Sequence, residues 1–130
     1  MSVSNHISNK QIIDERVLQD IRDLMEADFP GLVERFIVDA GSLLDEIEDA
    51  LAQDDAGRVH RAAHTLKASS ASLGASALSE CAKAFETMGR SGHLDGAADQ
   101  FATAREQYRL VTELLEQRLR DAHPNIPSQD

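Results

Sequence analysis

His64 and Lys67 are the two residues of this chain whose types and spacing best suit chemistry on an anion. They lie between Ala56 and Ser79, a stretch with no acidic residue in a chain whose net charge is −10. A neutral imidazole offers a nitrogen lone pair, and a lysine three residues later on a helix can neutralise an anionic group bound to that nitrogen. The spacing therefore indicates a nucleophile and a cation that act on the same anion.

Helical geometry predicts that the imidazole of His64 faces solvent. A helix turns by about 100° per residue, so the residues within about 50° of the opposite side follow from the spacing. They are Val59, Ala62, Leu66, Ser69, Ser70 and Leu73. The surface around His64 carries the small side chains of Ala68 and Ala71, which leaves room for a partner.

Two helices are predicted before the one that carries His64. The first begins with Asp14 as its cap. Its apolar residues at helical spacing are Ile12, Ile13, Val17, Leu18, Ile21, Leu24 and Met25. The second begins at Asp28-Phe29-Pro30, with Asp28 as the N-cap and the proline in the first turn, and it ends near Gln53.

The His64 helix and two more complete the prediction. The His64 helix runs from about Ala56 to Leu73, where Gly74 ends it. The next helix is broken by Gly89 together with the segment 90–93. Its inner residues are Leu78, Cys81, Ala82, Phe85 and Met88. The last helix begins near Leu94 or Asp95 and ends around Asp121. Cys81 is expected to be a packed, unreactive thiol.

Short connections between helices of this length make them antiparallel neighbours. We therefore expect an all-α fold, an up-down-up-down antiparallel four-helix bundle with an additional short N-terminal helix, over residues 12–121. Segments 1–11 and 122–130 are expected to be flexible. The first residues show neither the basic region nor the apolar region of a signal peptide, and no later stretch approaches about 20 continuous apolar residues, so we expect a cytoplasmic protein. The acidic excess argues against nucleic acid and membranes as partners and favours a soluble monomer.

The segment from Ala63 to Ala75 reads AHTLKASSASLGA. It resembles the histidine-containing phosphotransfer (HPt) domain, whose pattern is close to His-x-Leu-Lys-Gly-Ser/Ala-Ser/Ala followed by an apolar residue and Gly. The matching positions are His64, Leu66, Lys67, Ser69, Ser70, Leu73 and Gly74. The start of the preceding helix and the order of helices to about residue 120 are also similar to the family. The chain departs from the pattern at Ala68, where the family usually has Gly, and at Ser72, where Asn is frequent.

The resemblance implies a phosphorelay intermediate without a kinase or phosphatase centre of its own. His64 would be the phosphoacceptor, through Nε2, and Lys67 would stabilise the phosphoryl oxygens. A receiver-domain aspartate would be the donor and a second one the acceptor, with the Mg²⁺ in the receiver. The partners would be response-regulator receivers or a hybrid sensor histidine kinase. They would contact His60, Arg61, Ala68 and Ala71.

Helix geometry puts no carboxylate within one turn of His64 on its own face, so we expect neither a built-in general base nor a metal-binding acid cluster there. No glycine pattern suits a nucleotide. Two alternatives stay open. The chain could be a helical module that binds a partner without phosphorylation. His60 and His64, spaced i, i+4, could instead bind a metal, but the residue after His60 is Arg61, where a zinc protease of the His-Glu-x-x-His type has Glu. Two ligands beside nearby cations also make a poor site, so we expect this chain itself to bind no metal and no cofactor.

Overall fold

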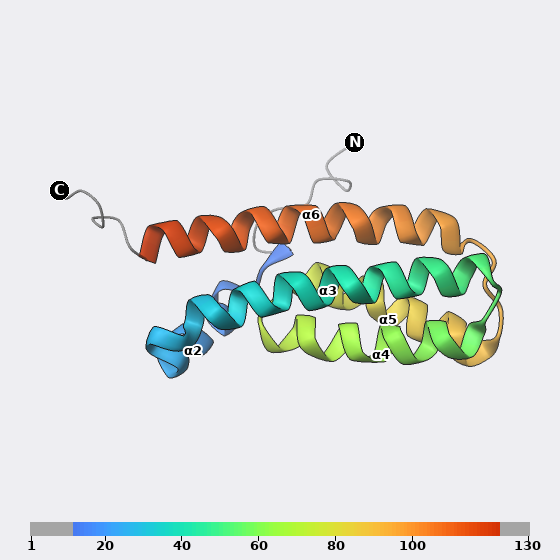
Figure 1. Ribbon diagram of the computed structural model, residues 1–130, viewed down its shortest axis with the longest axis horizontal. Helices are drawn as coiled ribbons and strands as arrows, with labels where there is room; N and C mark the ends of the chain where they lie inside the picture. The colour runs from blue at the N-terminus through green and yellow to red at the C-terminus, as the bar shows by residue number, and fades with distance from the viewer. Residues whose placement is uncertain (1–11, 123–130) are drawn as a thin grey trace.

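Four long helices pack antiparallel in residues 12–122, the part of the chain that this computed structural model describes (Figure 1). They are α3 (Phe29–Ala52), α4 (Ala56–Ser72), α5 (Ser76–Ser91) and α6 (Ala97–Ala122). The pairs α3 and α4, α4 and α5, α5 and α6, and α3 and α6 are in contact, which closes the bundle. The short helix α2 (Glu15–Met25) and the 3-10 turn η2 (Glu26–Asp28) precede it. The predicted fold class is confirmed.

The side chain of Asp14 caps α2 as predicted. Its carboxylate accepts hydrogen bonds from the backbone N–H groups of Arg16 and Val17, at 3.1 and 3.3 Å. Its own backbone N–H donates to the carbonyl of Gly74, at 2.7 Å. Gly74 has a φ of +84°, and a Cβ added there would lie 2.8 Å from the carbonyl oxygen of Asp14. The turn between α4 and α5 therefore fits the start of α2 because residue 74 is glycine.

The position of the N-cap of α3 is confirmed, whereas a capping hydrogen bond from its side chain is absent. Asp28 stands at the N-cap of α3, but its side chain makes no capping hydrogen bond. Its backbone is already helical because η2 continues directly into α3, so the carboxylate does not have the extended geometry of a cap. Leu24 shares the helical spacing of the other apolar residues of α2 but is 75% exposed near the end of that helix.

The helix boundaries after α4 differ from the expected ones in two places. Gly89 does not break α5, which continues to Ser91 and ends where Gly92 adopts a φ of +80°. α6 begins at Ala97 and not at Leu94 or Asp95, because a turn comes first, in which the N–H of Ala97 donates to the carbonyl of Leu94. Segments 1–11 and 122–130, expected to be flexible, lie outside the described residues except for Ala122 at the end of α6.

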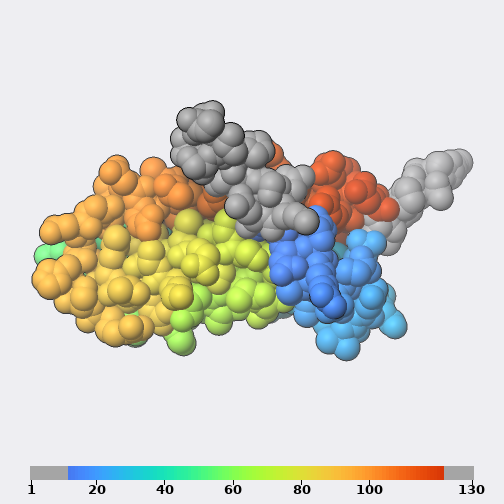
Figure 2. All heavy atoms as spheres, turned by 180° about the vertical axis from the view of Figure 1, so that it is seen from behind, coloured from blue at the N-terminus to red at the C-terminus, as the bar shows by residue number. Residues whose placement is uncertain are grey.

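Apolar side chains from α2 to α6 fill one continuous core. The largest fully buried ones are Phe29, Phe85, Ile13, Leu44, Ile47, Leu66, Leu78 and Leu115. On the face shown in Figure 2, α5 covers the middle, with α4 along its lower edge and the start of α6 above. Within the described residues, no helix is long and apolar enough to cross a membrane.

Gly89 lets the backbones of α4 and α5 approach each other closely. A Cβ added at Gly89 would lie 2.5 Å from the backbone nitrogen of His60, 2.7 Å from the carbonyl oxygen of Ala56 and 2.8 Å from the Cα of His60. These are backbone atoms, so no side chain can move aside and the helices themselves must separate. The contact is therefore what requires glycine inside this helix.

Gly89→Ala is expected to lower the free energy of unfolding by about 1–3 kcal/mol, because overpacking outweighs the better helix propensity of alanine. Urea unfolding followed by circular dichroism measures the change. Gly31→Ala in α3 is the matched control, since an added Cβ meets nothing within 4 Å there; it should leave stability unchanged or raise it. Equal effects of the two variants would show that the close approach at Gly89 does not limit stability.

Candidate functional site

The imidazole of His64 faces solvent, as the helical geometry predicts. Its side chain is 63% exposed. On the opposite side of α4, Val59, Leu66 and Ser70 are fully buried. Ala63 is also buried, on the side of α4 that packs against α5. His64 is thus an accessible side chain on a firmly packed helix.

Glu86 of α5 brings a carboxylate to the same place. Its Oε2 lies 2.6 Å from Nδ1 of His64, and its Oε1 lies 2.6 Å from Nζ of Lys67. The side chain of Glu86 is only 5% exposed, whereas that of Lys67 is 34% exposed. The hydrogen bond from Lys67, and secondly that from His64, lower the pKa of Glu86 to about 2. The carboxylate is therefore ionised at neutral pH and can only accept hydrogen bonds.

This hydrogen bond decides which nitrogen of His64 carries the proton. Because Glu86 can only accept, Nδ1 of His64 must be the donor. In the neutral ring, Nε2 then keeps its lone pair. The nitrogen that keeps its lone pair is thus selected by a residue on a neighbouring helix, in the way that a carboxylate orients the histidine of a catalytic triad.

The antiparallel packing of α4 and α5 explains how Glu86 reaches His64. Gly74 lies in the turn between the two helices, ten residues after His64 and twelve before Glu86. Helices of equal rise therefore bring the two positions opposite each other. The small buried residues Ala82 and Gly89, four residues before and three after Glu86, let the helices pack closely there.

Further polar side chains surround this pair. Nδ1 of His60 lies 3.2 Å from the backbone carbonyl oxygen of Glu86. The rings of His60 and His64 are stacked, with centroids 6.3 Å apart and planes inclined by 22°. Nη2 of Arg90 lies 3.8 Å from Oε2 of Glu86. Arg61, Ala68 and Ala71 are exposed on α4.

The helical spacing around His64 could not predict Glu86, because it shows only the neighbours of His64 on its own helix. The expectation that no carboxylate serves His64 is wrong for the folded bundle, although it holds for α4 alone. One signal was available. Glu86 directly follows Phe85 and lies four residues after Ala82, on the inner side of its helix. An ionisable residue at such a position requires buried partners.

A groove of about 360 Å³ lies on the other side of α4, between α4, α3 and α2. It is lined by Ile21, Leu32, Arg35, Phe36, Asp39, Ser69, Ser72 and Leu73. Its α4 residues begin five positions after His64. Small exposed residues of α4, Ala68 and Ala71, adjoin it. An accessible apolar surface thus extends from the neighbourhood of His64.

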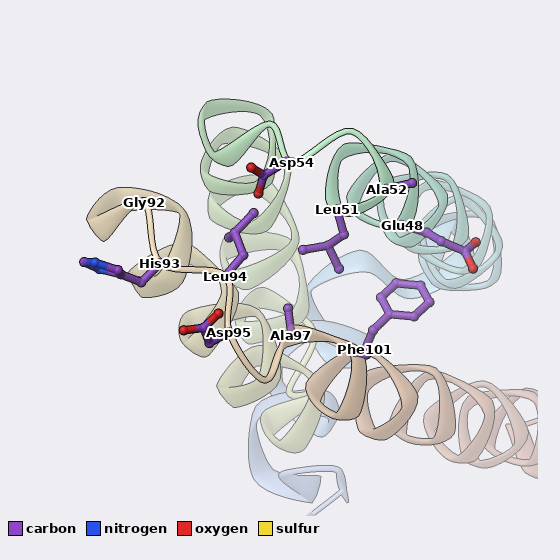
Figure 3. A pocket seen from close by; sticks show the side chains of 11 residues that line it. Glu48, Leu51, Ala52, Asp54, Gly92, His93, Leu94, Asp95, Ala97 and Phe101 are labelled. Atoms are coloured by element: carbon purple, nitrogen blue, oxygen red, sulfur yellow. The ribbon is translucent and has the colours of Figure 1, made fainter.

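A larger pocket, of about 610 Å³, lies where the α3–α4 and α5–α6 connections meet (Figure 3). Leu51, Leu94 and Phe101 point toward its interior, and His93 points away from it. No residue of the His64 and Glu86 cluster lines this pocket. Elsewhere on α5, Cys81 is half-buried, and burial raises the pKa of its thiol, which fits the expected packed role.

An exposed histidine with one free ring nitrogen, held by a buried carboxylate on a four-helix bundle, is suited to carry a group on nitrogen. The family model of the Hpt domain matches residues 31–123. The chain therefore belongs to the Hpt domain family, as the resemblance of its His64 segment implied.

Two solved structures of similar proteins support this assignment. Histidine-containing phosphotransfer protein B (HptB) from Pseudomonas aeruginosa PAO1 is 29% identical, with a TM-score of 0.80, over 82% of this chain and 93% of that one. A histidine-containing phosphotransfer protein from rice is 26% identical, with a TM-score of 0.70, over 86% of this chain and 88% of that one. No curated protein matches the chain in sequence.

Proposed function

We propose that His64 accepts a phosphoryl group from the aspartyl phosphate of a receiver domain and passes it to the aspartate of a second receiver. A histidine phosphotransfer role in phosphorelays follows from membership of the family. The single observation that supports His64 as the carrier is its hydrogen bond to Glu86, which leaves the lone pair on the exposed nitrogen Nε2. The chain acts as a carrier and needs no kinase or phosphatase centre of its own.

The transfer step uses few groups of this chain. The Nε2 lone pair of His64 forms a bond to phosphorus while the bond between phosphorus and the aspartyl oxygen breaks, and the electron pair of that bond returns to the aspartate carboxylate. His64 keeps its proton on Nδ1, so the phosphorylated ring is cationic. Oε2 of Glu86, 2.6 Å from Nδ1, accepts the hydrogen bond of that proton and stabilises the positive ring. In-line positioning, and Mg²⁺ in the acidic pocket of the receiver, supply the rest.

The surface beside His64 is suited to a docking receiver. Ala68 and Ala71 have small side chains that project little from the exposed side of α4. The groove between α2, α3 and α4 offers apolar contacts next to them. We expect His60 and Arg61 to lie at the edge of the interface. Ala68, where the family usually has glycine, adds one methyl group to this surface. The proposal is for a cytoplasmic, monomeric carrier that binds neither nucleic acid nor membranes, in agreement with its net charge of −10.

Mixing the purified chain with a labelled phosphoreceiver and Mg²⁺ tests the proposal. We expect the label to move to an adduct on this chain that is labile in acid and stable in base, as a phosphohistidine is. A second, unlabelled receiver should then remove it. If no receiver of the source organism transfers label, and partners bind regardless of phosphorylation, the chain is instead a binding module that works without phosphorylation.

Lys67→Ala is expected to slow the transfer by about tenfold, a typical loss when a residue that supports a reacting group is removed. Lys67 holds Oε1 of Glu86 at 2.6 Å, and from the same position its ammonium can approach the phosphoryl oxygens. Rapid-quench transfer assays measure the rate, and circular dichroism checks the fold. Lys83→Ala, an exposed lysine of α5, is the matched control. An unchanged rate in Lys67→Ala would remove this residue from the mechanism.

A further inference from the structure

Glu86 orients not one histidine but two. Its carboxylate accepts from Nδ1 of His64, and its backbone carbonyl lies 3.2 Å from Nδ1 of His60. A carbonyl oxygen can only accept, so Nδ1 of His60 is a donor as well. Both neutral rings therefore keep their lone pairs on Nε2. The two nitrogens belong to side chains one helical turn apart on α4, of which His64 is exposed and His60 is half-buried.

Two such nitrogens form the chelating pair that late transition metals prefer. Histidines spaced i, i+4 on a helix bind zinc in proteases of the His-Glu-x-x-His type. The distance from zinc to a histidine nitrogen is about 2.0–2.1 Å. At these distances, and at a tetrahedral angle, the two ring centroids would be about 5 Å apart. They are 6.3 Å apart in the free protein. The smaller separation requires the ring of His64, whose side chain is 63% exposed, to tilt toward His60 about its hydrogen bond to Glu86.

A metal-binding histidine also needs a hydrogen-bond partner for its other ring nitrogen, and Glu86 provides one for each ring. A metal-binding histidine normally donates its other ring N–H to a carboxylate or a backbone carbonyl, which fixes the ring and makes the ligand more basic. His64 has the first of these partners and His60 the second, both from Glu86. Lys67 and Arg90 both lie against the Glu86 carboxylate, whereas Arg61 is exposed on α4 next to His60.

No group of three or more His, Cys, Asp or Glu side chains in residues 12–122 is arranged to hold a metal. The two imidazoles would therefore be the protein ligands, and water would fill the remaining positions. A site with two protein ligands binds reversibly, as a regulatory site must.

We propose that Nε2 of His60 and Nε2 of His64 together bind a divalent late transition-metal ion, with Zn²⁺ as the representative. The bound ion occupies the lone pair that would attack phosphorus, so metal binding and phosphorylation of His64 exclude each other. This regulatory consequence rests on the proposed function, whereas the binding itself does not. Mg²⁺ does not compete, because it prefers oxygen ligands.

Calorimetric titration of the full-length chain with Zn²⁺ tests the binding without any phosphoryl donor. We expect His60→Ala to weaken zinc binding by at least about tenfold, because the chelate loses one of its two protein ligands. Glu86→Gln should weaken it by about 10- to 100-fold through the loss of the carboxylate partner. His93→Ala removes an exposed histidine outside the cluster and should have no effect. Equal affinities of the wild type and His60→Ala would overturn the proposal.

Phosphotransfer rates of the wild type and His60→Ala, measured in millimolar Mg²⁺ with and without Zn²⁺, test the regulatory consequence. Each rate with zinc is divided by the rate of the same protein without zinc. Zinc should slow the wild type at least tenfold more than His60→Ala. Equal inhibition of both proteins would overturn the regulatory proposal and would place the zinc effect on the receiver. A failure of all transfer would contradict the proposed function and leave the calorimetric result standing.

Discussion

His64→Gln is expected to abolish the labelled adduct. Glutamine has no nitrogen lone pair that can attack phosphorus, because the amide delocalises it. The variant should remain folded: the side chain of residue 64 is 63% exposed, and an amide N–H can still donate to Oε2 of Glu86. Surface substitutions of this kind change stability by about 0.5 kcal/mol or less.

Label transfer from a phosphorylated receiver, followed by gel autoradiography, measures this outcome. His93→Gln is the matched control, since His93 is also exposed but lies on the α5–α6 connection. It should carry label like the wild type. Label that persists on the His64→Gln protein would move the acceptor to another residue, and a further loss of label in His64→Gln/His60→Gln would identify His60.

Glu86→Gln is expected to slow transfer by about 10- to 100-fold, the usual cost of removing a partner that orients a reactive histidine. The reason lies in the competition between Lys67 and His64 for the introduced amide. The ammonium of Lys67 can only donate, so it attracts the amide oxygen, and the amide nitrogen then faces Nδ1 of His64. Nδ1 must accept that hydrogen bond, which moves the ring proton to Nε2 and blocks the attacking lone pair.

The nitrogen chemical shifts of His64 in ¹⁵N-labelled protein show which tautomer is present. Adding Lys67→Met to Glu86→Gln should return the ring proton to Nδ1, as read from these chemical shifts, because the amide oxygen is then free to turn toward His64. Such a reversal is a coupling between neighbouring residues that a double-mutant cycle measures. Equal rates of Glu86→Gln and the wild type would show that Glu86 does not set the state of the ring.

Comparing the wild type with Glu86→Gln at several pH values tests the contribution of Glu86 to stability, whose sign follows from the pKa of this residue. This pKa falls from 4.5 to about 2 in the folded protein, chiefly through the hydrogen bond from Lys67. A lowered carboxyl pKa stabilises the fold above pH 4.5, and the stabilisation is lost as the pH falls toward 2. The wild type should therefore be more stable than Glu86→Gln at neutral pH, and urea midpoints should show this difference shrinking from about pH 4.5 downward.

The sequence predicts the helices, their antiparallel order and which side of each helix is buried. It misses the side-chain contacts that form only when two helices pack together. The exposure of His64, the burial of Leu66 and the cap at Asp14 follow from local spacing and local hydrogen bonds. Glu86 is different, because its role arises only when α5 packs against α4. Gly89 is a second example. The local pattern predicts a helix break there, because a single helix gives no sign that the glycine is needed for the close approach of the α4 backbone.

The contact at Gly89 also fixes when the site becomes ready to react. Backbone atoms set how closely α4 and α5 approach at Gly89, three residues after Glu86, and the Glu86 carboxylate lies 2.6 Å from Nδ1 of His64 in this arrangement. If His64 is the phosphoacceptor as proposed, the free protein already holds the tautomer that the transfer needs before a partner arrives. An encounter therefore has to supply only the alignment of phosphorus with Nε2, and no ordering of the histidine is left for the bound state.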